Sequence, residues 1–225
     1  MFAGHVGAGL AIGRAERRVN VGAFIFAALL LDVVLWLFVV LGWESLTIPA
    51  NFASTHQAEY VFPYSHGLLA SIAWSALAGA AALLLWHSRL KERLRIAALV
   101  AAAVLSHWFL DALVHVPELP LAGASSMKVG LGLWQDMPVA LAAEALILAA
   151  GLGLFLPGAR LARARKFWLA LLSLLILVFT VAGMTIAPPP PSAMAMAAGS
   201  LATIIVVSAL ACWLGRLPAE LHQRQ

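Results

Sequence analysis

Charge is scarce in this sequence. Charged residues make up 11% of its 225 residues, whereas 63% are hydrophobic. Ordinary soluble domains are about 25% charged and about 45–50% apolar. A soluble globule of this length would not have enough charge to cover its surface, so a soluble enzyme and a disordered chain are both excluded. The chain has one cysteine, Cys212, which excludes a scaffold held together by internal disulfides.

Long apolar runs take the place of the missing charges. Each run has about 20–25 residues, which is enough to cross a bilayer as a helix. We therefore predict an all-α fold, a polytopic transmembrane helix bundle of about six spans. A shorter apolar piece, Phe2–Gly13, precedes them and is predicted to form an N-terminal half-helix. The six expected spans are Val19–Trp43, His66–His87, Ile96–Val116, Leu133–Leu156, Phe167–Ala187 and Ser192–Gly215.

Basic residues mark one side of this bundle. Every Lys and Arg except Lys128 precedes the first span or follows the second, fourth or sixth. Because cytoplasmic loops carry the excess of Lys and Arg, both ends of the six-span bundle are expected inside the cell. The same rule accounts for the net charge of +4, so we expect no nucleic-acid partner.

The ionisable residues inside the apolar runs are all carboxylates and histidines. A carboxylate at the centre of a transmembrane helix costs about 2.5–3.5 kcal/mol, so it is retained when it is paired or functional. No Lys or Arg is available as its partner, which leaves a bound cation, shared protons, or protonated carboxylates bonded to one another. The set is Asp32, His66, His107, Asp111, His115, Asp136 and Glu144, with His5 in the short first segment.

The heights of these residues agree. At about 1.5 Å per residue, four of these residues lie roughly 18–24 Å from the cytoplasmic ends of three different spans. They are Asp32, His107, Asp111 and Glu144. A half-helix ending at Arg14 would raise His5 roughly 14 Å above the same face. We therefore predict one polar chamber in the outer half of the bundle.

The spacing of His107, Asp111 and His115 is the strongest local pattern. Steps of four keep their side chains within about 80° on one helix face. Mixed His and Asp ligands on one face suit Zn²⁺ or a similar metal. A hydrogen-bonded pair that fixes helix packing is the alternative. We expect His115 to be solvated at the outer interface, and Asp136 to begin a helix.

The chain divides into two parts of one membrane domain. Residues 1–156 hold the half-helix and the four spans that carry the ionisable residues. Residues 157–225 hold two spans without any, and these are interpreted as a C-terminal scaffold hairpin.

Four short motifs resemble those of a family of predicted bacterial membrane-bound metal-dependent hydrolases and follow one another in the same order as in that family. One branch of the family is regulated by the DNA-damage response. The His-x3-Asp-x3-His helix is also similar to part of the metal site of zinc-dependent phospholipase C. The motifs are Gly4-His5, Leu31-Asp32, the run Tyr64 to Gly67 and the run Ser106 to Asp111.

The resemblance implies a bacterial inner-membrane protein and a set of metal ligands, with zinc as the expected divalent metal. The implied ligands are His5, Asp32, His66, His107 and Asp111. Two motifs are shorter here than in the family. The chain has Val34 and Leu35 where the family commonly has a second Asp and a His, and it lacks the first His of the motif around His66.

These features predict a membrane-embedded metal-dependent hydrolase. The expected substrate is a phosphoester or a lipid-like molecule from the outer side, and membrane lipid is the expected partner. Glu144 is the candidate general base, and Asp32 is assigned to both the metal and the reaction. Two alternatives remain: a proton- or cation-coupled transporter, and a non-catalytic subunit of a membrane complex with a relict metal site. The sequence leaves the oligomeric state open.

Overall fold

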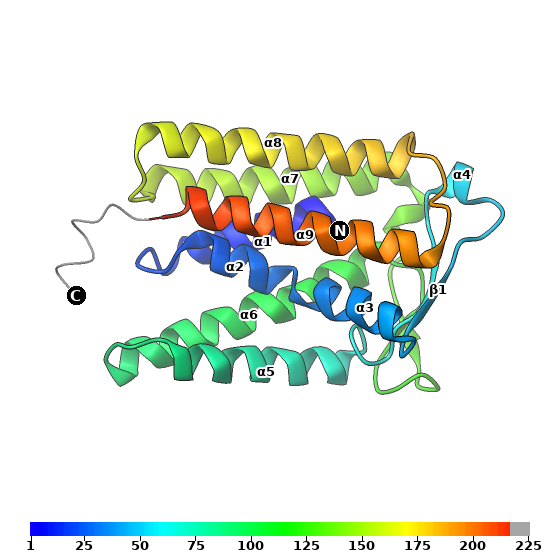
Figure 1. Cartoon of the computed structure of the whole chain (residues 1–225), viewed down its shortest axis with the longest axis horizontal. Helices are drawn as coiled ribbons and strands as arrows, with labels where there is room; N and C mark the ends of the chain where they lie inside the picture. Colours follow the sequence, from blue (N-terminus) through cyan, green and yellow to red (C-terminus); the bar gives the residue numbers. More distant parts are fainter. Residues whose placement is uncertain (217–225) are drawn as a thin grey trace.

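The computed structural model describes residues 1–216 and is an all-α bundle, as predicted (Figure 1). The long helices run side by side, and two small two-stranded sheets lie at one end. Arg224, one of the basic residues counted above, lies outside the described residues. The helices are α1 (Phe2–Gly13), α2 (Val21–Ala28), α3 (Leu30–Leu41), α4 (Phe52–Thr55), α5 (Leu68–Leu85), α6 (Leu90–Val114), α7 (Met137–Phe155), α8 (Arg163–Thr185) and α9 (Ala193–Leu214). The strands are β1 (Ser45–Thr47), β2 (Glu59–Val61), β3 (Leu119–Pro120) and β4 (Lys128–Val129).

Five helices, α5 to α9, are long and apolar enough to cross a membrane, and α2 with α3 forms a sixth, bent candidate. Their length and composition indicate a membrane protein. The short N-terminal helix is present over the predicted residues. Three helices begin four or more residues from the predicted start, and one of them is α8, which begins at Arg163 instead of Phe167. Helix α6 begins at Leu90, so it includes the basic segment before Ile96, and α7 begins at Met137, where Asp136 caps it as expected by accepting from the Val139 N–H.

The first predicted span is not one straight helix. It breaks at Leu29 into α2 and α3, whose axes differ by 49°. At the break, the Ala28 carbonyl accepts a hydrogen bond from Nδ1 of His107 at 2.7 Å. A side chain that inserts into the hydrogen-bond ladder is a known cause of a sharp bend. The bend therefore belongs to the site described below.

Helix α1 lies inside the bundle, behind α9 in Figure 1. It packs closely on α7 and α2 because glycines face both neighbours. A Cβ atom on Gly7 would lie 2.6 Å from the Ile147 carbonyl oxygen, and one on Gly9 would lie 2.7 Å from the Ile25 Cα. Most of α1 is buried, so this helix occupies the interior of the bundle beside α7 and α2.

The last two helices, α8 and α9, separate from each other along part of their length. Helix α9 packs mainly along α2 and α3, whereas α8 packs on α7 and α1. The two are joined at one end by a proline-rich turn. This arrangement leaves one side of the bundle open between them.

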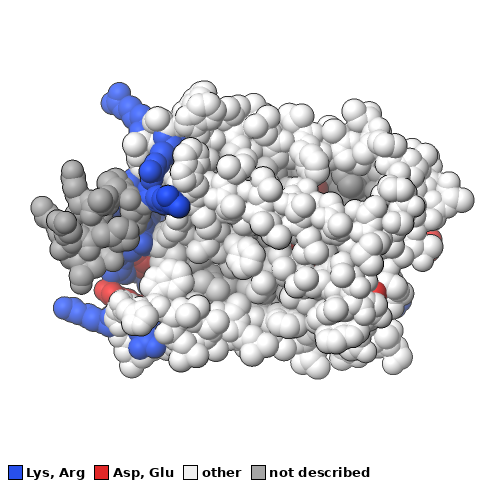
Figure 2. Space-filling view, in the orientation of Figure 1, with Lys and Arg blue, Asp and Glu red and all other residues white. Residues whose placement is uncertain are grey.

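The two ends of the bundle differ in charge. Lys and Arg side chains gather at the end near α1 and the loop before α2 (Figure 2). In that loop, Arg18 hydrogen-bonds Glu16 and also reaches Glu92 of α6. The bonds from Arg18 to Glu16 hold the pKa of the Glu16 carboxyl below its ordinary value. The opposite end is covered by the hairpins β1–β2 and β3–β4 and by α4.

Candidate metal centre

All five predicted ligands lie in one cluster. His5 comes from α1 and Asp32 from the first turn of α3, while His107 and Asp111 lie one turn apart on α6. His66 lies in the turn before α5. Two groups, His5–Asp32–His107 and His66–His107–Asp111, each have one ligand atom per residue within 4.8 Å of the others. These His and Asp groups could hold a metal ion.

Nε2 of His66 and Nε2 of His107 each lie close to a carboxylate oxygen of Asp32 and to one of Asp111. Nε2 of His66 lies 3.1 Å from Nε2 of His107, and both lie 3.7 Å from Oδ1 of Asp32. Oδ2 of Asp111 is 3.3 Å from the first nitrogen and 3.1 Å from the second. In a tetrahedral site with zinc–ligand bonds of about 2.0–2.2 Å, ligand atoms are separated by about 3.3–3.6 Å. The observed distances lie close to this range.

The position of the proton on His107 follows from its other contact. Its Nδ1 faces the Ala28 carbonyl at 2.7 Å, and a carbonyl oxygen can only accept. Nδ1 therefore carries the proton, and in neutral His107 the Nε2 lone pair faces the carboxylates of Asp32 and Asp111. Metal-binding histidines are oriented by the same kind of outer hydrogen bond. The arrangement requires either a second proton or a cation among these atoms.

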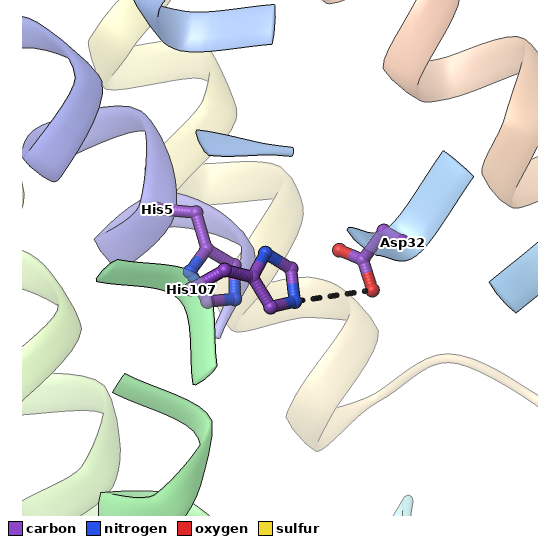
Figure 3. Close-up of side chains that lie close together, drawn as sticks. All are labelled: His5, Asp32 and His107. Atoms are coloured by element: carbon purple, nitrogen blue, oxygen red, sulfur yellow. Dashed lines mark ion pairs between the residues drawn. The ribbon is translucent and has the colours of Figure 1, made fainter. Parts of the chain in front are cut away.

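Asp111 joins the two halves of the cluster. Its Oδ2 faces His66 and His107, while its Oδ1 lies 3.1 Å from Nε2 of His5 and accepts from the Met1 amine at 3.3 Å. The rings of His5 and His107 stack with their centroids 3.6 Å apart (Figure 3). Nδ1 of His5 is buried and has no hydrogen-bond partner among the described residues. His5 is therefore held against the cluster by Asp111 and by stacking.

The cluster is accessible from the side of Asp32. The side chains of His107 and Asp111 are 0% and 2% exposed, whereas that of Asp32 is 20% exposed. Figure 3 shows the Asp32 carboxylate facing the edge of the His107 ring. Asp32 also lines a cavity of about 600 Å³ that His66, Asp111 and Glu144 share. A molecule in this cavity would meet Asp32 as the most exposed residue of the cluster.

Glu144 lies on α7 and is buried. Its Oε2 accepts from the backbone N–H groups of Ala3 and Gly4, at 2.9 and 3.2 Å. A carboxylate there satisfies unpaired donors at the N-terminus of α1 and interacts favourably with the helix dipole. Glu144 thus positions the helix that carries His5, and it also lines the cavity. Its assignment as a general base stays a prediction.

His115 is not solvated, contrary to the expectation from the sequence. It is buried beside the cluster, where its Nδ1 contacts Oε1 of Glu118 at 2.6 Å and its Nε2 lies 4.0 Å from Oδ2 of Asp111. The helical spacing from His107 already pointed to this position. Proximity to Pro117 suggested the interface, but the β1–β2 hairpin covers this end of the bundle and Tyr60 packs on the His115 ring.

Glu44 is another buried carboxylate close to the cluster. It is buried just after α3, and its Oε1 accepts from the N–H groups of Tyr64 and Ser65, at 2.7 and 2.8 Å. The Ser65 hydroxyl in turn contacts Nδ1 of His66 at 2.8 Å. Burial raises the pKa of the Glu44 carboxyl above its ordinary value. Glu44 therefore fixes the turn that presents His66.

The segment between α3 and α5 closes over the cavity. Phe52, His56 and Tyr60 line it from the segment between α3 and α5. Burial raises the pKa of the Tyr60 phenol above its ordinary value, so this hydroxyl stays protonated at neutral pH. This segment therefore caps the cavity at that end of the bundle.

Comparisons of this chain with family models, with curated proteins and with solved structures give no match.

Proposed function

We propose that this protein is a membrane-embedded metal-dependent hydrolase that acts on a phosphoester or lipid-like substrate from the outer side of a bacterial inner membrane. The observation that supports this most is that Nε2 of both His66 and His107 lies 3.7 Å from Oδ1 of Asp32 and 3.1–3.3 Å from Oδ2 of Asp111. They are buried or half-buried, and no Lys or Arg of the described residues lines the cavity beside them. The Met1 ammonium pairs with Oδ1 of Asp111, and a bound cation is the simplest partner for the other oxygen of Asp111 and for Asp32.

Zinc is the metal that this donor set fits best. Two imidazole nitrogens and two carboxylate oxygens are typical zinc ligands, whereas magnesium and calcium prefer six or more oxygen ligands. His66, His107, Asp32 and Asp111 would hold it, with His5 within reach. When bound, zinc polarises a phosphoryl or acyl oxygen and acidifies a water molecule.

The residues of the chain would then position the substrate and move the proton. Glu144 keeps Oε2 on the N–H groups of α1, so Oε1 is the oxygen that would accept a proton from the attacking water. Asp32, the ligand that is most open to the cavity, would face the reacting group. The protonated hydroxyl of Tyr60, which also lines the cavity, is a donor available to the leaving group or to a phosphoryl oxygen.

The orientation in the membrane follows from the charge of the two ends. Basic side chains gather at one end, and the positive-inside rule assigns this end to the cytoplasm. The cluster and its cavity lie toward the opposite end, under the loops that follow α3 and α6. A substrate would therefore come from the outer leaflet or the periplasm.

The packing of α1 favours an enzyme over a transporter. A proton or cation pathway must connect the two faces of the membrane. Between the cluster and the basic end, the interior is filled by α1, whose glycines bring its backbone against α7 and α2. The cavity is thus accessible from one side, as expected for a site that binds and releases its substrate on the same side.

The metal is tested by elemental analysis of the purified protein. We expect about one zinc per chain in the wild type and a loss of most of it in His107→Ala and Asp111→Ala. His87→Ala, at an exposed position by the basic end, is the matched control and should keep its zinc. Size-exclusion profiles show whether each variant is folded. Wild-type protein without stoichiometric metal, or folded His107→Ala protein that retains it, would rule out this metal centre.

The hydrolase activity is tested separately with Glu144→Gln. The amide oxygen can still accept from Ala3 and Gly4, so the fold and zinc content should be preserved, while the rate falls by about 10²–10⁴-fold. The substrates are a chromogenic phosphodiester and a phospholipid in mixed micelles. If neither is hydrolysed by zinc-loaded wild-type protein, the hydrolase proposal is wrong. If Glu144→Gln is as active as the wild type, the assignment of Glu144 as the general base is wrong.

A further inference from the structure

The cavity has a second wall that the sequence marks only as scaffold. It consists of the facing sides of α8 and α9, which contain no ionisable residue over this stretch. Thr180, Gly183 and Met184 line it from α8, and Met196, Gly199 and Thr203 line it from α9. The cavity therefore has a polar end at the His/Asp cluster and a mainly apolar end between these two helices.

The apolar end opens on the side of the bundle, not at its end. Figure 2 shows a hollow in the wall between α8 and α9, with acidic atoms visible inside it. Phe179, at this opening, is 57% exposed, and it contacts Phe2 of α1 edge-on. Neighbouring exposed residues of the two helices, such as Leu175 and Ile205, are apolar. In a membrane this wall faces the lipid chains.

The height of the opening agrees with the outer leaflet. Counted from the basic end of α8 at Arg163, Phe179 lies roughly 24 Å along the helix axis, close to the outer end of the span. On α9 the lining residues lie in the half next to the proline-rich turn. A molecule that enters here comes from the hydrocarbon region of the outer leaflet.

We propose that the space between α8 and α9 is a lateral entrance that binds the acyl chain of a membrane lipid, with the polar head of the lipid at the His/Asp cluster. The volume of about 600 Å³ lies within the range of pockets that hold small ligands. The apolar wall matches a hydrocarbon chain, and the carboxylates and histidines match a polar head or its phosphate through the metal. This inference rests on the proposed function for the role of the head, but binding of the chain requires no turnover.

Three glycines allow a matched test of the entrance. A Cβ atom added to Gly183 or Gly199 meets no atom within 4 Å, so a leucine at either position extends into the cavity without a backbone clash. The same holds for Gly153, which is exposed on α7 and does not line the cavity. Replacement of a helical glycine by leucine favours the helix at all three positions.

The experiment is photolabelling of the full-length protein in nanodiscs that contain phosphatidylglycerol with a diazirine on its acyl chain. Labelled peptides are located by mass spectrometry. In the wild type we expect labels at residues 179–204 in excess over the exposed apolar face of α5. Gly183→Leu and Gly199→Leu should reduce the excess by about tenfold, because they fill the space that the chain would occupy. Gly153→Leu should leave it unchanged.

Two outcomes would overturn the lateral entrance: equal labelling of α5 and of the segment 179–204, or an excess that persists in both filled variants. The acyl chain contacts the apolar wall of α8 and α9 and not the metal, so His107→Ala protein should lose zinc and keep the acyl-chain label. If zinc is absent from the wild type but the label is specific, the lipid site stands and the hydrolase proposal fails. If zinc is present and the label is not specific, the lipid site fails and the metal centre stands.

Discussion

At the scale of single residues, the centre depends on groups that orient the ligands. His107 is fixed by the Ala28 carbonyl, and His66 by Ser65, which is itself held by Glu44. Such outer groups commonly change metal affinity by about 10–100-fold when they are removed. Glu44 is the best residue for a test, because it touches none of the ligands directly.

We predict that Glu44→Ala weakens zinc binding by about tenfold or more, since the turn that carries His66 loses two hydrogen-bond acceptor contacts. Glu44→Gln should bind zinc like the wild type, because its side-chain oxygen can still accept from both N–H groups. Affinity is measured by competition with a chelator of known zinc affinity. Glu59→Ala, an exposed carboxylate on β2, is the control. Equal zinc affinity in Glu44→Ala and the wild type would show that Glu44 does not position His66.

The sequence indicated which residues cluster better than it indicated the groups around them. His107 and Asp111 could be recognised because a step of four places two side chains on one helix face and because no basic partner was available. Glu44 gave no such signal. It lies in a loop, and its contacts to Tyr64 and Ser65 depend on how that loop folds back over the bundle.

At the scale of helices, the position of α1 determines whether His5 reaches the cluster. Gly7 and Gly151 allow the backbones of α1 and α7 to touch, and a Cβ atom on Gly151 would overlap the carbonyl of Gly7. Small residues at such contacts are typical of helix packing in membranes.

Gly151→Ala is therefore expected to destabilise the fold by about 1–3 kcal/mol through overpacking. It should also lower zinc content, because α1 moves away from α7 and takes His5 with it. Gly153→Ala, two residues along the same helix with open space around it, should change stability by less than about 1 kcal/mol. Thermal unfolding in detergent and elemental analysis measure the two effects. A Gly151→Ala protein as stable and as rich in zinc as the wild type would contradict the close packing of α1.

The bend between α2 and α3 shows where prediction from the sequence failed. Val19–Trp43 is long and apolar enough for one straight span, and no proline or glycine stands at the break. The cause is the contact of His107 with the Ala28 carbonyl, a residue 79 positions away in the sequence. Hydropathy along the chain predicts that a span is present, but a bend that arises from a tertiary contact leaves no pattern in the local sequence.

At the scale of the whole molecule, the sequence predicted the number of spans and the separation of charge between the two ends. It predicted a polar chamber but not the apolar wall of the cavity, since the path of α9 along α2 and α3, apart from α8, is set by packing between helices. The last two spans were interpreted as scaffold because they lack ionisable residues. Their apolar faces line the cavity instead, so the absence of charge there is consistent with a site for a hydrocarbon chain.

The orientation of the whole bundle can be tested because the chain has one cysteine, Cys212, at the basic end. In a Cys212→Ser background, we predict that a membrane-impermeant maleimide labels Ser125→Cys in intact spheroplasts and labels Ser88→Cys only after the membrane is opened. Both serines are exposed in loops, Ser125 between β3 and β4 and Ser88 between α5 and α6. The basic residues that follow Ser88 assign its loop to the cytoplasm. Labelling of Ser88→Cys in intact spheroplasts with protection of Ser125→Cys would show that the bundle has the opposite orientation. The cavity would then open toward the inner leaflet.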